Sequence, residues 1–257
     1  MKKISLIIPA YNEERRIGKM LENYSYYFEK LRKNKKLDYE LIVVINNTTD
    51  KTDKIVNSYI KKNERIFCLN FERGGKGFAV IEGFKHALKK NNDFIGFVDA
   101  DMATPPEQYF KLIEKINNVD GVIADRYLNG SKIYPAPSWK RIAARKLFNF
   151  VIRSFLLIPY GDTQCGAKVF RRKAIEKIIN SIGMSNWAFD VDLLYNLKKN
   201  GFRIIPCKTL WYDKEYSKIN FWKAGPWMAL AIVRLRILNS PFQRFIRIYD
   251  KLIGYIP

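Results

Sequence analysis

Two aspartates, Asp99 and Asp101, stand one residue apart directly after the apolar run 94–98. An apolar run of this length, bounded by polar residues, is typical of a strand that is buried on both faces of a sheet. Ligands collect at the carboxyl ends of strands in open α/β sheets, and paired carboxylates there can hold a divalent cation together with a diphosphate. A turn leading into the helix predicted after Thr104 would have the same residues, so the pair alone does not decide between a site and a turn.

Other polar segments follow other predicted strands. Strands are predicted at 3–9, 39–45, 66–71 and 94–98, and helices at 17–31, 52–62, 78–89 and from about 106 alternate with them. Four consecutive βα units predict a mostly parallel sheet with helices on both faces. Asn12 is expected to cap the first helix. The polar turn 46–50 follows the second strand, and the basic, glycine-rich loop 73–77 follows the third.

The loop 73–77 has neither the spacing of a P-loop nor that of a dinucleotide-binding loop. Its glycines nevertheless permit close backbone approach, and Arg73 and Lys76 supply positive charge. An ordinary surface turn would have the same composition.

The second half of the chain continues the pattern. A strand at 119–124 precedes Arg126, and a helix at 139–158 has an apolar face with cations beside it. The turn 162–166 leads into a strand that includes Val169 and Phe170. A helix at 186–199 and a strand at 202–210 complete the predicted domain.

Composition limits the classes of partner. The chain has 257 residues and a formal net charge of +21, from 46 Lys and Arg against 25 Asp and Glu. Such an excess favours nucleic acid, an anionic membrane surface or phosphorylated substrates. Cys68, Cys165 and Cys207 are widely spaced, which argues against a zinc site or a disulfide framework and fits a reducing compartment. The single histidine, His86, argues against a Ser-His-Asp or Cys-His hydrolase.

The C-terminal residues differ from the rest. No run of eighteen apolar residues occurs, so no transmembrane helix is predicted. Apolar residues recur at helical spacing across 242–256, with Arg244, Arg247 and Lys251 on the other side. This pattern suits a helix in the plane of a membrane interface, although packing on the core or on a second subunit would give the same stripe. The high positive charge favours the membrane, so we expect one domain at 1–216 and an interfacial tail at 217–257.

Six motifs in order give the chain a resemblance to family-two inverting glycosyltransferases of the GT-A fold. They are IIPAYNEE, the turn after the second strand, ERGGKGFAV, VDADMATPP, DTQCGAKVF and WAFDVDLLY. The last two look most like dolichyl-phosphate β-glucosyltransferases, which belong to the polyprenyl-phosphate sugar synthases. The resemblance covers 1 to about 216. It implies an α/β GT-A fold, Mg²⁺ or Mn²⁺ as cofactor, and transfer of a hexose from a nucleoside diphosphate to a dolichyl or polyprenyl phosphate, with glucose and UDP favoured.

The resemblance also implies roles for single residues. Asp99 and Asp101 would be the metal-binding pair, with Ala100 between them, and would reach ribose and diphosphate. Arg126 and Arg141 match arginines that bind the lipid phosphate in the dolichol-phosphate mannose synthases, which are near neighbours in the family. Contacts to nucleotide, diphosphate, sugar or acceptor are implied for Pro9, Ala10, Tyr11, Glu13, Asn46, Lys76, Asp162, Gln164, Asp190 and Asp192.

Two positions depart from the family. The turn after the second strand, where the family recognises the base, is commonly DDGS, whereas this chain has Ile45-Asn46-Asn47-Thr48 and lacks both acids. The mannose synthases have a metal-binding Gln where this chain has Ala103. The metal would therefore depend more on water and phosphate for its ligands.

The implied reaction needs no base for the acceptor, because a phosphate monoester has a second pKa of about 6 and is largely dianionic at neutral pH. Asp101 would hold the metal, the two arginines would hold the acceptor phosphate, and Asp190 would orient the sugar or assist as a base. The expected location is peripheral, on the cytoplasmic face of a membrane.

Four alternatives stay open. They are a dolichyl-phosphate mannose synthase using GDP-mannose, a family-two transferase with a non-lipid acceptor, a catalytically silent scaffold and a nucleic-acid-binding protein. The last is disfavoured, and nucleic acid is not expected as a partner, because the cations are spread along the chain and no recognised nucleic-acid module is present.

Overall fold

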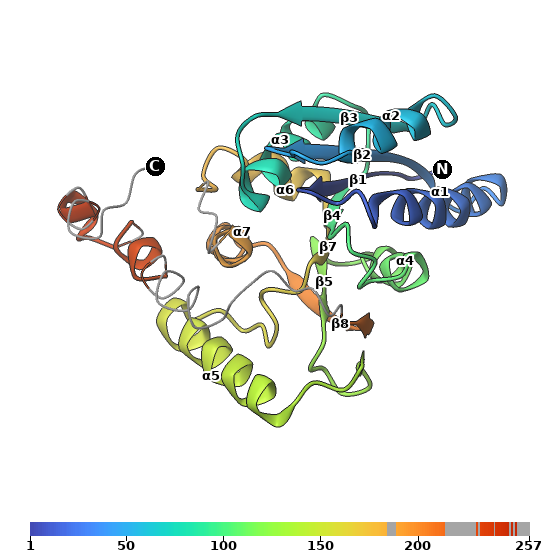
Figure 1. Cartoon of the computed structure of the whole chain (residues 1–257). Helices are drawn as coiled ribbons and strands as arrows, with labels where there is room; N and C mark the ends of the chain where they lie inside the picture. The colour runs from blue at the N-terminus through green and yellow to red at the C-terminus, as the bar shows by residue number, and fades with distance from the viewer. Residues whose placement is uncertain are drawn as a thin grey trace.

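A computed structural model describes residues 1–183, 189–213, 230, 232–238, 240–246, 248 and 250 of the chain. Two sheets lie within these residues, one of seven strands in the order β3-β2-β1-β4-β7-β5-β8 and one formed by β6 and β9 (Figure 1). Most of the expected tail, and the start of the WAFDVDLLY motif, lie outside the described residues.

The strands are β1 (Lys3–Ala10), β2 (Asp38–Asn46), β3 (Ile66–Phe71), β4 (Phe94–Val98), β5 (Gly121–Asp125), β6 (Lys132–Tyr134), β7 (Ala167–Arg171), β8 (Ile204–Lys208) and β9 (Leu210–Tyr212). The helices are α1 (Ile17–Lys33), α2 (Thr52–Ile60), α3 (Lys76–Leu88), α4 (Pro106–Glu114), α5 (Trp139–Leu156), α6 (Arg172–Ile178), α7 (Phe189–Lys199) and the short 3₁₀ turn η1 (Gln243–Phe245).

The large sheet is mostly parallel. β1 pairs in parallel with β2 and β4, β2 with β3, and β5 with β8. Only β7 runs antiparallel, between β4 and β5. The predicted mostly parallel α/β sheet is therefore confirmed.

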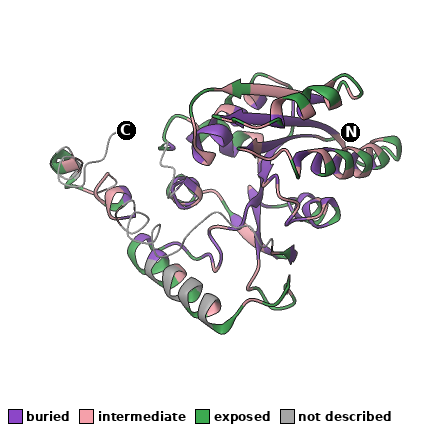
Figure 2. Ribbon diagram, viewed as in Figure 1, coloured by how far each residue is buried: buried purple, intermediate pink, exposed green. Residues whose placement is uncertain are grey.

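Helices cover both faces of the sheet, which explains the apolar runs of its strands. Side chains alternate between the two faces along a strand. Leu6 of β1 belongs to the cluster that contains Tyr24 and Phe28 of α1, whereas Ile7 belongs to the cluster that contains Phe84 of α3. Figure 2 shows these inner strands as buried. Two apolar layers thus hold the strand ends in fixed positions.

The strand order reverses between β1 and β4, because β2 and β3 lie on one side of β1 and β4 lies on the other. Such a reversal leaves a crevice beyond the carboxyl ends of the two strands, where α/β proteins bind their ligands. The segments after β1 and β4, which include Tyr11 and Asp99, therefore meet at this crevice.

Some local predictions were wrong. Asn12 does not cap α1, which begins at Ile17 without a side-chain cap. The backbone of Asn12 has a φ of 52°, and its Oδ1 accepts a hydrogen bond from Thr49 N at 2.8 Å. The side chain therefore joins the loops that follow β1 and β2.

The strand predicted at 202–210 is two strands. β8 pairs with β5, whereas β9 pairs with β6, because Thr209 between them hydrogen-bonds through its backbone to Ser131 and Lys132. None of the described helices combines the length and the apolar character needed to cross a membrane.

Candidate active site

The two aspartates after β4 lie at the crevice. Asp99 N donates to Gly166 O at 3.0 Å, and Asp101 Oδ1 accepts from Ala103 N at 2.9 Å. Burial, and secondly the neighbouring charge of Asp99, raise the pKa of Asp101. A cation bound to both carboxylates would relieve this repulsion.

The donor set fits a hard cation that shares its ligands with a substrate. In the described part of the chain, no three His, Cys, Asp or Glu side chains gather as a metal cage. Mg²⁺ is commonly held by one or two carboxylates, with substrate phosphates and water as the other ligands. Asp99 and Asp101 match that arrangement.

Four charged side chains, beginning with Asp99, form a row of alternating sign. We call this row the charge row, and its members in order are Asp99, Lys76, Asp190 and Lys168. Lys76 Nζ lies 2.7 Å from Asp99 Oδ1 and 3.6 Å from Asp190 Oδ2. Lys168 Nζ lies 2.6 Å from Asp190 Oδ1. Burial opposes ionisation of Asp190, but Lys168 and Lys76 together hold its pKa below the usual range. Asp190 is therefore a stable anion between two cations.

A glycine allows the charge row to form. Lys76 and Gly77 begin α3, and a Cβ on Gly77 would lie 2.9 Å from Cβ of Phe189, the first residue of α7. Any larger residue would push the two helix starts apart. Gly77 thus brings Lys76 beside Asp190.

The loop 162–166 connects this row to Arg126. Arg126 Nε and Nη2 donate to the two carboxylate oxygens of Asp162 at 2.6 and 2.8 Å, in a bidentate pair. The guanidinium also lies 4.9 Å from the ring centroid of Trp211. The side chains of Arg126 and Asp162 are only 11% and 1% exposed. Although burial opposes it, Arg126 keeps the pKa of Asp162 low.

The predicted nucleotide side is held together by Asn46. Its Nδ2 donates to Ala10 O at 3.0 Å, and its Oδ1 accepts from Gly75 N at 3.1 Å. An ionised aspartate at this position could accept but not donate. The asparagine that replaces the acid of the family turn therefore has a structural role here, because its amide connects β1 to the loop before α3.

Glu13 is near this turn. Its backbone N–H donates a hydrogen bond to Thr52 Oγ1 at 2.8 Å, and its carboxylate pairs with Arg16 at 2.6 Å. Pro9 is half-buried, and Tyr11 is exposed. The loop after β1 thus presents an aromatic ring at the crevice.

The remaining predicted residues lie in different surroundings. Ala100 is buried and Gln164 half-buried. Asp192 is buried in α7, where its carboxylate accepts from Gly183 N at 2.6 Å and from Asn196 Nδ2 at 2.7 Å. Burial raises the pKa of Asp192 to about 7. Among the described contacts, none joins Asp192 to the charge row. Arg141 lies in the first turn of α5, and its side chain is outside the described part of the structure.

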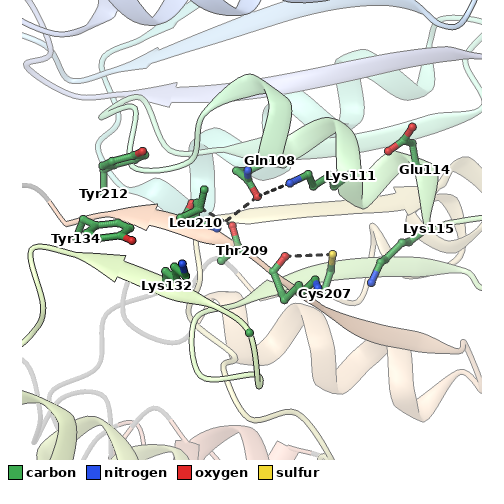
Figure 3. A pocket seen from close by; sticks show the side chains of 12 residues that line it. Gln108, Lys111, Glu114, Lys115, Lys132, Tyr134, Cys207, Thr209, Leu210 and Tyr212 are labelled. Atoms are coloured by element: carbon green, nitrogen blue, oxygen red, sulfur yellow. Dashed lines mark hydrogen bonds between the residues drawn. The ribbon is translucent and has the colours of Figure 1, made fainter.

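A groove of about 670 Å³ lies between α4 and the strands β6, β8 and β9 (Figure 3). Lys111, Lys115, Lys132 and Lys208 line it together with Tyr134, Tyr212 and other residues. None of the predicted site residues lines this groove. Its connection to the site is the hydrogen bond from Tyr212 N to Ala103 O at 2.9 Å.

Sequence reasoning missed Lys168 and Gly166. Lys168 was visible only as a charged residue within the apolar segment Ala167–Phe170, which is a sign of a buried charge that needs a partner. Gly166 stood within a quoted motif, but its contact with Asp99 is a tertiary feature.

Comparison with known proteins agrees with this architecture. Residues 5–179 match the family described as Glycosyl transferase family 2. The chain is 32% identical over 244 residues to the dolichyl-phosphate beta-glucosyltransferase of Dictyostelium discoideum, covering 91% of this chain and 73% of that protein. It is 29% identical over 259 residues to the Homo sapiens protein of the same name, covering 94% and 78%. The predicted resemblance is confirmed.

Solved structures share the fold at low sequence identity. The mannosyltransferase PcManGT from Pyrobaculum calidifontis, in complex with GDP-Man and Mn²⁺, has a TM-score of 0.62 and 18% identity, covering 96% of this chain and 68% of that one. Glucosyl-3-phosphoglycerate synthase from Mycobacterium tuberculosis, with Mn²⁺, UDP and glucosyl-3-phosphoglycerate, has a TM-score of 0.60 and 17% identity, covering 92% and 79%. These likenesses confirm the predicted GT-A fold.

Proposed function

We propose, since the chain belongs to glycosyltransferase family 2, that it transfers glucose from UDP-glucose to dolichyl phosphate with inversion at the anomeric carbon. The observation that carries the proposal is the gathering of Asp99, Asp101, Lys76 and Asp190 at the crevice between β1 and β4. Charges of both signs at a switch point suit a nucleoside diphosphate and its counter-ion. The relatives that carry the dolichyl-phosphate beta-glucosyltransferase name support the lipid acceptor and the sugar.

The donor would lie across the loops after β1, β2 and β4. The nucleotide pocket would be lined by Pro9, Ala10, Tyr11, Glu13 and Asn46. Because Lys76 Nζ already lies 2.7 Å from Asp99, it is within reach of a diphosphate bound near that carboxylate. Lys76 would thus supply fixed positive charge to the leaving group.

Asp99 and Asp101 would hold Mg²⁺ or Mn²⁺. The raised pKa of Asp101 supports this assignment, since two adjacent carboxylates in a partly buried turn favour a shared cation. When bound, the metal would neutralise charge that develops on the departing diphosphate.

The acceptor phosphate would attack without a protein base, since it is already largely dianionic at neutral pH. An efficient general base has a pKa near the working pH, whereas Lys168 and Lys76 keep the pKa of Asp190 low. We therefore assign Asp190 to orienting the sugar, together with Gln164. Asp192, whose carboxylate is hydrogen-bonded to Gly183 and Asn196, is assigned a supporting role in α7.

Arg126 would meet the acceptor phosphate, with Arg141 as its partner. Asp162 accepts one proton each from Nε and Nη2 of Arg126, so the phosphate would be bound through the protons that remain on Nη1 and Nη2. This arrangement makes Asp162 the residue that orients the guanidinium. Loss of Arg126 should then raise the KM for dolichyl phosphate more than the KM for UDP-glucose, and an equal rise in both would count against the role.

Helix α5 and the tail would place the protein on the cytoplasmic face of a membrane, as a peripheral protein. Phe150 and Phe155 of α5 are 65% and 50% exposed, and Trp139, Phe242 and Phe245 are exposed as well. Exposed aromatic and apolar side chains beside cations suit an anionic interface, where each Lys or Arg adds about 1 kcal/mol.

Vesicle sedimentation tests the membrane contact. Changing Phe150 and Phe155 to Ser should release the protein from vesicles that contain anionic lipid. Tyr26→Ser is the matched control, because Tyr26 is a 75% exposed aromatic residue on α1. Equal vesicle binding by both variants would mean that α5 does not contact the membrane.

The activity test is a panel of labelled UDP- and GDP-sugars, offered with dolichyl phosphate or with soluble sugar and protein acceptors. We expect product in the organic phase from UDP-glucose and dolichyl phosphate. Transfer from GDP-mannose instead would identify a mannose synthase, and product only in the aqueous phase would identify a non-lipid acceptor.

A further inference from the structure

We propose that Lys168 is a positioning residue: its buried ammonium fixes Asp190 and, through Asp190, the ammonium of Lys76 at the donor diphosphate. The proposal rests on the proposed function, because it assigns Lys168 a part in the same reaction.

Lys168 lies inside the sheet. It belongs to β7, opposite Phe97 of β4 and Ile123 of β5, and its side chain is 0% exposed. The ammonium donates to Cys165 O and to Asp190 Oδ1, both at 2.6 Å, and lies 5.1 Å from the ring centroid of Phe97. With partners on two sides and a ring beside it, the side chain has a single defined position.

The fold alone does not call for a cation at this position. Removing a charge from water is costly, and replacing a buried ion pair by apolar residues of similar volume is often neutral or stabilising. The next two residues of β7, Val169 and Phe170, are apolar and fully buried, so the strand accommodates such side chains. A role in positioning charges at the site therefore explains the buried Lys168–Asp190 pair better than a role in packing the core.

That positioning role follows from the two oxygens of Asp190. Oδ1 is held by Lys168, and Oδ2 faces Lys76 at 3.6 Å. Lys76 in turn remains 2.7 Å from Asp99. Without Lys168, the carboxylate of Asp190 would be free to rotate into closer contact with Lys76 and draw its ammonium away from Asp99. Lys168 thereby keeps the ammonium of Lys76 closer to Asp99 than to Asp190.

A double-mutant cycle tests this chain of contacts. The variants are Lys168→Met, Asp190→Asn and the two combined, with Lys173→Met as the matched control, because Lys173 is 67% exposed and pairs with Asp120 on the surface. Transfer to dolichyl phosphate, hydrolysis of UDP-glucose without acceptor, UDP affinity and Tm are measured for each.

We expect Lys168→Met and Asp190→Asn each to lower kcat on the order of 100-fold, as misplacement of a reacting group does. The KM for dolichyl phosphate should stay unchanged, since the acceptor contacts belong to Arg126. The combined variant should be no more than about threefold slower than Asp190→Asn, because residues that act as one unit are not additive. It should also regain part of the Tm lost in Lys168→Met, since the buried carboxylate that lost one of its two cations is then replaced by a neutral amide.

Two results would overturn the proposal. One is a kcat of Lys168→Met within about threefold of Lys173→Met despite a lowered Tm, which would mean that Lys168 only supports the fold. The other is a combined loss equal to the product of the single losses, on the order of 10⁴-fold, which would mean that the two residues act independently.

Failure of the proposed function gives a different pattern. If wild-type protein hydrolyses UDP-glucose but transfers nothing to dolichyl phosphate, the acceptor is wrong, and the cycle is read from hydrolysis. If it does neither, the cycle is read from the affinity for whichever nucleotide, UDP or GDP, the wild-type protein binds. Lys168→Met should lower that affinity roughly tenfold through Lys76, and unchanged affinity would overturn the positioning role.

Discussion

Gly166→Ala should abolish most of the activity while leaving the protein folded. The three atoms nearest to a Cβ at Gly166 all belong to the Asp99 carboxyl group, and even the most distant of them, Oδ1, would be only 2.8 Å away, against ordinary contact from 3.4 Å. The obstacle is a side chain rather than backbone, so the carboxylate can move aside. Asp99 would then leave its position 2.7 Å from Lys76.

The expected magnitudes separate stability from activity. Crowding of this kind costs about 1–3 kcal/mol of unfolding free energy, which is a fall in Tm of several °C for a chain of this size. Displacement of a carboxylate that is proposed to hold the metal and that contacts Lys76 should lower kcat/KM for UDP-glucose on the order of 100-fold.

Gly18→Ala is the matched control. It is the same change in α1, where the nearest atoms would lie at an ordinary 3.6 Å, and it should raise stability by up to about 1 kcal/mol through helix propensity. Steady-state turnover of UDP-glucose and thermal unfolding are measured for both variants. Activity of Gly166→Ala within threefold of Gly18→Ala would refute the inference that Asp99 must stay in place.

Three further changes test other contacts. Burial raises the pKa of Asp192 to about 7, so the stability that Asp192 contributes falls as the pH rises from about 4 to 7; between pH 5 and pH 8, urea unfolding should show the unfolding free energy of wild type falling by on the order of 2 kcal/mol relative to that of Asp192→Asn. Arg126→Lys cannot bond both oxygens of Asp162, so unfolding free energy should fall by about 1.5–3 kcal/mol and the KM for dolichyl phosphate should rise; an unchanged KM would exclude Arg126 from the acceptor site. Asn46→Asp loses the donor to Ala10 O and should cost about 1–3 kcal/mol in urea unfolding, and no loss would mean that the amide is not needed there.

The fold was predictable because its central strands contain continuous apolar runs. β1, β2 and β4 fill both faces of the sheet, so their sequences carry a clear signal even without an alignment. β6 and β9 were not predicted, since each has only three residues and they pair across a long stretch of chain. Their sequences contain no periodicity long enough to recognise.

The sequence indicated which candidate residues follow the strands, but it did not reveal their contacts. Asp99 and Asp101 follow a strand directly, so their place at the crevice is a local property. The charge row is different, because Lys76 and Asp190 meet only where α3 and α7 begin side by side. In the same way, the sequence singled out both Arg126 and Asp162, but nothing in their spacing reveals that they pair.

The most direct measurement compares wild type with Asp101→Asn in transfer of labelled glucose from UDP-glucose to dolichyl phosphate, with Mn²⁺ or Mg²⁺ and with EDTA. The account predicts lipid-linked product from the wild type with metal, loss of that product in EDTA, and little product from Asp101→Asn under either condition. Equal product from both proteins, unaffected by EDTA, would contradict the claim that the carboxylates after β4 hold the metal and the donor.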